Sequence, residues 1–122
     1  MGNVYCNLEK EHEAAAQRAK EGILAGSDVE KICKIFHLLA DPSRLKILLA
    51  LMNGDMCVYH LTEVCDSSVS AVSHQLRVLR DNNIVRGKRI GKNVEYSIAD
   101  HHVREIVNMA IAHLHCDVEE VK

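Results

Sequence analysis

Histidine, cysteine and acidic residues near the end of the chain are spaced like metal ligands. The chain of 122 residues has eight histidines and five cysteines, and imidazole, thiolate and carboxylate groups together suit tetrahedral zinc. His102 and His113 are 11 residues apart. On a helix this is about 20° beyond three full turns, so the two share a face, but they stand about 16 Å apart along the axis. One helix therefore cannot place both histidines on one ion.

A second pair of metal-binding side chains is Cys57 and His60, three residues apart and so on one face of a helix. Cys6, and with it His12, could complete this second site from the same chain or from another copy. The odd number of cysteines and the lack of a Cys-x-x-Cys pair argue against a disulfide framework or a zinc ribbon.

The composition predicts a single globular domain without a membrane segment. Apolar residues make up 48% of the chain and charged residues 26%, which is enough apolar surface for a core. No apolar run approaches the ~20 residues of a membrane span, and the first residues lack the features of a signal peptide. We expect a cytoplasmic protein that does not bind membranes.

Helix signals dominate the chain, and two strands stand near its end. The predicted fold class is mainly α with a two-stranded β wing, with residues 1–26 as an N-terminal segment or first helix and 27–122 as the main domain. The capping box that starts at Ser27 and the Asp41-Pro42 pair are helix starts. We expect helices over 8–24, 28–40, 42–52, 57–64, 69–81 and 101–116, and strands over 84–90 and 94–98.

The stretch from Ala71 to Lys92 is basic, although the whole chain has a net charge of −2. It holds six arginines and lysines and one aspartate, which is the charge pattern of a surface that binds a polyanion. The helix over 69–81 has one apolar and one polar face, follows a short helix and a tight turn, and precedes a basic hairpin. This pattern predicts a winged helix-turn-helix. The residues expected to face the major groove are Ser70, Ser73, His74, Gln75 and Arg77, and those expected at phosphates are Arg86, Lys88, Arg89 and Lys92.

The sequence resembles the ArsR/SmtB family of metal-sensing transcriptional repressors. The resemblance rests on residues 39–48 (LADPSRLKIL), 56–61 (MCVYHL), 69–79 (VSAVSHQLRVL), 90–98 (IGKNVEYSI) and 100–102 (DHH). It implies a winged helix-turn-helix homodimer with long terminal helices at the interface. It also implies a repressor that binds double-stranded operator DNA without metal and leaves it when metal binds.

The resemblance also implies where the metal binds. An antiparallel copy of the last helix would set Asp100 and His102 of one chain beside His113 and Cys116 of the other. The first three match the ligands of the family, whereas Cys116 stands where the family has His or Glu, so His115 or Glu119 are alternatives. This donor set favours Zn(II) and allows Cd(II). Pb(II) is disfavoured because Tyr59 stands where thiolate-rich sensors have a second cysteine, and such soft ions prefer three thiolates.

A thiol-redox repressor and an enzyme are the alternatives to a metal sensor. A thiol-redox repressor of the same fold would pair Cys33 with Cys116, although Cys33 falls on the apolar face of its helix and is expected in the core. An enzyme is not expected, because the chain has no His-Glu-x-x-His, no Gly-rich phosphate loop and no serine nucleophile elbow. We therefore expect no small organic substrate.

Overall fold

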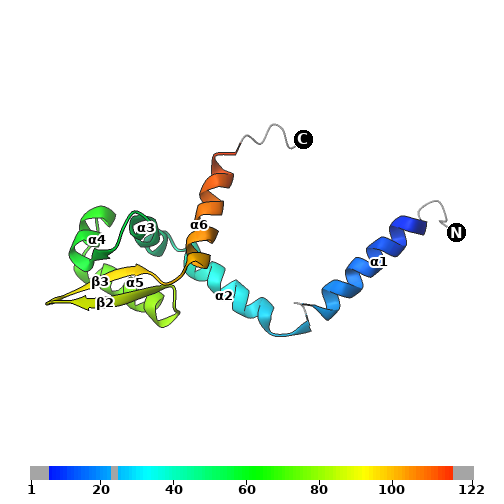
Figure 1. The fold of residues 1–122 in the computed structure, drawn as a ribbon, viewed down its shortest axis with the longest axis horizontal. Coiled ribbons are helices and arrows are strands. Elements are labelled where there is room, and N and C mark those ends of the chain that lie inside the picture. Colours follow the sequence, from blue (N-terminus) through cyan, green and yellow to red (C-terminus); the bar gives the residue numbers. More distant parts are fainter. Residues whose placement is uncertain (1–5, 23–24, 117–122) are drawn as a thin grey trace. The chain divides into compact units, whose positions relative to one another are not determined.

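The computed structural model describes residues 6–22 and 25–116, and of residues 6 and 7 it describes the backbone alone. The chain divides into residues 1–38, called here the N-terminal unit, and residues 39–122, called the reading unit. Figure 1 shows the elements along the chain. No helix of the described residues is long and apolar enough to cross a membrane.

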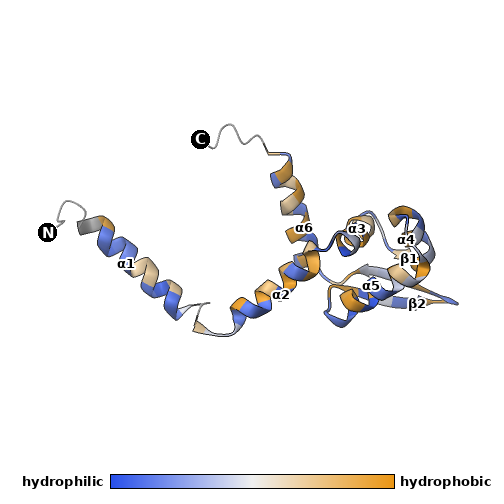
Figure 2. Ribbon diagram, turned by 180° about the vertical axis from the view of Figure 1, so that it is seen from behind, coloured by the Kyte–Doolittle hydropathy of each residue, from blue (hydrophilic) through white to orange (hydrophobic). Residues whose placement is uncertain are grey.

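The N-terminal unit holds the helix α1 (Cys6–Glu21) and all but the last two residues of α2 (Asp28–Ala40). The described side chains of α1 are all exposed, whereas α2 has an apolar face, drawn in orange in Figure 2. Val29, Ile32 and Phe36 on this face are each more than a third exposed. The expectation that Cys33 lies in the core is wrong, because its thiol is exposed.

The described part of the reading unit has four helices, and a side-chain cap starts three of them. They are α3 (Pro42–Leu51), α4 (Val58–Cys65), α5 (Val69–Asp81) and α6 (His101–Leu114). The Asp41 carboxylate accepts a hydrogen bond from the backbone N–H of Arg44 at 3.0 Å, and the Ser68 hydroxyl accepts one from Ala71 at 3.1 Å. Each cap satisfies an N–H group that has no partner within its helix.

A three-stranded antiparallel sheet, in the order β1-β3-β2, completes the reading unit. The hairpin of β2 (Val85–Ile90) and β3 (Asn93–Ile98) confirms the predicted pair of strands. The third strand, β1 (Met56–Cys57), was not predicted, and Cys57 is its last residue and the N-cap of α4. The expected helix start at Cys57 is therefore wrong by one residue, because pairing of Cys57 with Glu95 holds it extended.

The core of the reading unit lies among α3, α4 and α5, which pack together beside the hairpin (Figure 1). Leu48, Leu51, Leu61 and Leu79 are fully buried there. The apolar face of α5 is buried from Val72 to Leu79, but Val69 in its first turn stays 44% exposed. The core thus fixes the rotation of α5 and turns its opposite face to the solvent.

Candidate nucleic-acid interface and metal donors

The outer face of α5 presents a short polar stripe to the solvent. Ser70, His74 and Arg77 are exposed, while Ser73 and Gln75 on the flanks of the helix are half-buried. Positions 70, 74 and 77 stand three or four residues apart, so they share one face opposite the buried one. A helix with this kind of face fits the major groove of B-DNA, where its side chains reach the base edges.

Gln75 is held by a contact that the sequence does not reveal. Its Oε1 accepts a hydrogen bond from Nη1 of Arg44 in α3, at 3.2 Å. A guanidinium group can only donate, so the bond uses the oxygen of the Gln75 amide. The NH2 group of this amide therefore points away from Arg44 and can donate to another group. The residue missed by sequence reasoning is Arg44, which ties the first turn of α3 to α5.

The hairpin of β2 and β3 forms a wing whose exposed basic side chains form no ion pair with a described carboxylate. Arg86, Lys88, Arg89 and Lys92 are exposed, and the ion pairs within the described ranges are Arg80 with Asp81 and His102 with Asp100. The turn at the tip uses Gly91, whose φ of 64° favours glycine. No described carboxylate lies within ion-pair distance of the four wing cations, so their charge remains for an external anion.

Asp100 and His102 meet at the start of α6. Oδ1 of Asp100 accepts hydrogen bonds from the backbone N–H groups of His102, at 3.0 Å, and Val103, at 3.2 Å. The same oxygen lies 3.7 Å from Nδ1 of His102. The hydrogen bond from Val103 is the largest cause of a lowered pKa of the Asp100 carboxyl, with the His102 N–H and the two nearby histidines adding to it. Asp100 is therefore an anion at neutral pH.

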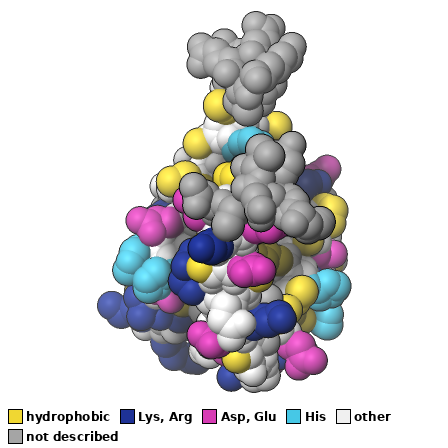
Figure 3. Space-filling view, turned by 90° about the vertical axis from the view of Figure 1, so that its right-hand side faces the viewer, with side chains coloured by type: hydrophobic (Ala, Val, Ile, Leu, Met, Phe, Trp, Pro, Cys, Tyr) yellow, Lys and Arg dark blue, Asp and Glu magenta, His cyan; other side chains and the backbone are white. Residues whose placement is uncertain are grey.

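The other predicted donors of α6 are also exposed. His113 lies in the last turn, while His115 is the C-cap and Cys116 follows it. Histidine side chains stand at the surface in the face that Figure 3 shows, and the Cys116 thiol is free and exposed. Glu119 lies outside the described residues. Within the described residues, no three His, Cys, Asp or Glu side chains come together closely enough to hold a metal ion.

Cys57 and His60 form a contact within one chain. The Cys57 Sγ lies 3.3 Å from Nδ1 of His60, because the N-cap and the third residue of α4 fall on the same side of the helix start. Both line a cavity that Asp55 and Glu95 also line, and these two carboxylates were not predicted. His12 is exposed on α1, and the side chain of Cys6 lies outside the described residues.

The reading unit has the architecture of a winged helix-turn-helix DNA-binding protein. A short helix, a tight turn and a second helix with an exposed polar stripe are followed directly by a basic hairpin, which is the arrangement of this class. The model of the bacterial regulatory proteins of the arsR family matches residues 41–86, from the cap of α3 to the start of β2, the first strand of the wing.

Similar proteins extend this match over most of the chain. A transcriptional repressor SmtB homolog of Synechocystis is 36% identical over 109 residues, which cover 89% of this chain and 83% of the relative. A cadmium resistance regulatory protein CadC homolog of Staphylococcus aureus is 35% identical over 88% of this chain and 89% of its own. The regulator NmtR of Mycobacterium tuberculosis is 45% identical over 68% of this chain and 69% of its own.

The fold of a solved relative agrees with these matches. The solution structure of apo-NmtR superposes with a TM-score of 0.67 and 41% identity, covering 75% of this chain and 78% of that one. The chain belongs to the ArsR/SmtB family of winged helix-turn-helix transcriptional regulators. It is a DNA-binding regulator and not an enzyme.

Proposed function

We propose that the protein is a homodimeric repressor that binds operator DNA without metal and releases it when Zn(II) or Cd(II) binds between its α6 helices. One observation carries the proposal: α6 has exposed metal donors and exposed apolar side chains along the same helix. The exposed apolar side chains favour association of α6 with a second copy. The exposed donors could then bind a metal between the two helices.

The dimer is inferred from the apolar residues that α6 leaves in water. Met109 is 72% and Leu114 77% exposed, although the buried face of the same helix begins at Val103 and Val107. Burial of such side chains stabilises an interface by about 25 cal/mol per Å². Symmetric association is the commonest way for a soluble chain to cover such a surface.

The metal site needs the second copy. His102 and His113 are about 16 Å apart along one helix, and the described part of one chain gathers no three donors. In an antiparallel pair, Asp100 and His102 would stand beside His113 and Cys116 of the other chain, and the pair of chains would carry two such sets. One carboxylate, two imidazoles and one thiolate fit tetrahedral Zn(II), and the thiolate adds tolerance for Cd(II). The name of the Staphylococcus relative, which refers to cadmium resistance, agrees with this range.

A second metal site is proposed at Cys57 and His60, to be completed by Cys6 and His12. The contact of 3.3 Å between Sγ and Nδ1 gives this site two donors in place. Its position at the end of β1 puts it next to the wing, because β1 pairs directly with β3.

On DNA, the proposal assigns the stripe of α5 to the major groove and the wing to the backbone. Ser70, His74 and Arg77 would meet base edges, with Ser73 and Gln75 at the flanks. The basic residues of the wing would meet phosphates, which contribute affinity and register but not base choice. Metal at α6 would favour a dimer geometry in which the two reading units no longer match the two half-sites. The coupling is reciprocal, so operator DNA must weaken metal binding by the same factor.

The test is fluorescence anisotropy on labelled DNA from the promoter region of the protein itself, with Zn(II), then Cd(II), then a chelator. We expect release by metal and recovery by chelator for the wild type. His102→Ala should bind DNA and ignore zinc, whereas His101→Ala, the matched control on the neighbouring exposed histidine, should still respond. If His102→Ala is released like the wild type, the α6 site is not the switch.

A second variant separates reading from sensing. Arg77→Ala removes a cation from the exposed stripe of α5 and should lose DNA binding while it keeps zinc binding by isothermal titration. If the variant loses both, Arg77 supports the fold and does not read DNA.

Thiol redox sensing is a second candidate, because Cys33 and Cys116 are both free and exposed. Mild oxidation followed by mass spectrometry would reveal a Cys33–Cys116 bond. DNA binding that is the same before and after reduction would exclude this candidate.

A further inference from the structure

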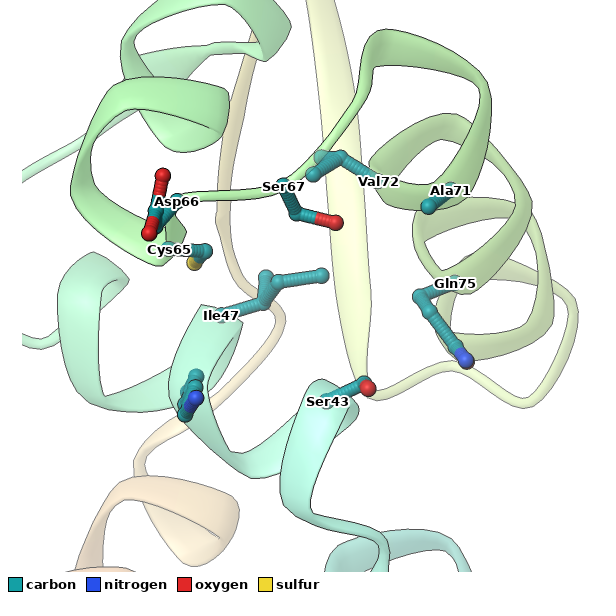
Figure 4. A pocket seen from close by; sticks show the side chains of 9 residues that line it. Ser43, Ile47, Cys65, Asp66, Ser67, Ala71, Val72 and Gln75 are labelled. Atoms are coloured by element: carbon teal, nitrogen blue, oxygen red, sulfur yellow. The ribbon is translucent and has the colours of Figure 1, made fainter.

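A cavity of about 240 Å³ lies on the flank of α5, between that helix, α3 and the turn after α4. Ile47, Val72 and Ala71 supply its apolar wall, and Figure 4 shows polar side chains from three segments around the same hollow. These polar side chains and the thiol beside them are Ser43, Lys46, Cys65, Asp66, Ser67 and Gln75. Gln75, on the flank of the stripe proposed to face the major groove, is shared with this cavity, whereas none of the described donors of the proposed metal sites lines it.

Hydrogen-bond donors dominate the polar lining. Gln75 is held with its Oε1 on Arg44, so its NH2 group remains as a donor beside the cavity. Ser43 and Ser67 add hydroxyl groups that can donate. Lys46 supplies an ammonium group, and no described carboxylate lies within ion-pair distance of it.

The charge of Lys46 acts within the cavity. Burial raises the pKa of the Cys65 thiol, and the nearby positive charge of Lys46 opposes this rise. One carboxylate, that of Asp66, also lines the cavity. In Figure 4 its side chain lies next to Cys65, whereas the Ser67 side chain extends away from them toward α5. An anion that enters from the side of Ser67 and Gln75 would therefore meet donors before it meets Asp66.

The place of the cavity suggests where that anion comes from. Ala71 and Gln75, which line it, stand next to Ser70 and His74 of the exposed stripe. On the other flank of α5, Ser73 lines a second cavity together with Lys92 of the wing. The stripe that is proposed to read bases is thus bracketed by two cationic flanks, as the major groove is bracketed by two phosphate backbones.

We propose that the cavity between α3 and α5 receives a phosphate group of the DNA backbone, with Lys46 as the cation and Ser43, Ser67 and Gln75 as neutral donors. The inference rests on the proposed DNA-binding function and adds a contact on the flank of α5 away from the wing. It assigns Lys46 to affinity and register, with no part in the choice of bases.

The first test is the salt dependence of DNA binding for Lys46→Gln. The plot of log K against log salt has a negative slope, and loss of one phosphate contact makes this slope less steep by about 0.9. We also expect Lys46→Gln to lose affinity for operator DNA and for unrelated DNA by a similar factor. Lys46→Arg should keep the slope. Lys34→Gln, on an exposed lysine of α2, is the control for the loss of one positive charge. An unchanged slope for Lys46→Gln overturns the inference, whereas a wild type that binds no DNA overturns the proposed function itself.

The second test identifies the partner of Lys46. Neutral methylphosphonates are placed one at a time along the backbone of the operator, and the affinities of the wild type and Lys46→Gln are compared. At the contacted position the substitution should weaken the wild type and leave Lys46→Gln unaffected, because the two changes remove the same contact. The inference is wrong if no position behaves in this way and inorganic phosphate alone shifts the NMR amide signals of Ser67 and Gln75 in the wild type but not in Lys46→Gln. The cavity would then be a site for free anions.

Discussion

Gly87 in the wing is a position where one added methyl group should cost stability. A Cβ atom at Gly87 would lie 2.9 Å from Cγ1 of Val94 and 3.2 Å from Cε1 of Tyr96, both on the neighbouring strand. Carbon atoms pack at about 3.5–4.0 Å, so the nearest contact is too short by more than half an ångström. Val94 is β-branched and turns away with difficulty, so the strands must shift.

The expected loss for Gly87→Ala follows from two opposing effects. Overpacking of this kind costs about 1–3 kcal/mol, while replacing a strand glycine by alanine returns roughly 0.5–1 kcal/mol of backbone entropy. The free energy of unfolding should therefore fall by about 1–2 kcal/mol. DNA affinity should fall as well, because the displaced strand carries Arg86 and Lys88 on either side of Gly87.

Urea denaturation followed by circular dichroism at fixed protein concentration measures this loss. Gly26→Ala is the matched control, because nothing lies within 4 Å of a Cβ at that position, and it should be neutral or slightly stabilising. The double variant Gly87→Ala with Val94→Ala removes the short contact and should recover part of the loss beyond additivity. The reasoning is refuted if Gly87→Ala is as stable as the wild type. It is also refuted if Gly87→Ala lowers the free energy of unfolding by the same amount when position 94 is alanine, because the short contact with Val94 would then not explain the loss.

Three further predictions concern caps and thiols. Ser68→Ala should lower the free energy of unfolding by about 1 kcal/mol, whereas Ser68→Asp should keep the cap of α5; equal stability of the two variants in urea would contradict this role. Burial raises the pKa of the Cys65 thiol, so at pH 8 iodoacetamide should modify Cys65 more slowly than the exposed Cys33, as read by mass spectrometry of digested samples. The Asp100 carboxyl has a pKa below its ordinary 3.8, so its contribution to stability is present above that pH and is lost as the pH falls through the lower folded value. An NMR titration of the Asp100 side chain with a midpoint at or above 3.8 would refute the cap geometry.

Local signals were sufficient to predict most of the reading unit. The cap at Asp41 and the two strands of the wing are set by residue types close together in the sequence, and each is confirmed. The strand β1 escaped prediction because two residues carry no periodic pattern. It exists through its pairing with Tyr96 and Glu95, which come much later in the chain.

The site was less predictable, because its geometry depends on contacts between distant residues. The bond from Arg44 that orients the amide of Gln75 joins residues 31 positions apart, and no spacing rule indicates it. The donors of α6 could be chosen by their helical face, but the described part of one chain does not bring three of them together. The two predicted metal sites therefore stay predictions.

The position of β2 at the edge of the sheet gives its positive charges another consequence. An edge strand has free backbone N–H and C=O groups that can pair with a strand of another molecule, and charged side chains along the edge discourage such pairing. In β2 every residue after Val85 is exposed, and half of the strand is arginine or lysine. Engineered variants that neutralise the wing to weaken DNA binding would also remove this protection. Such variants should be checked for aggregation before a loss of DNA affinity is attributed to missing phosphate contacts.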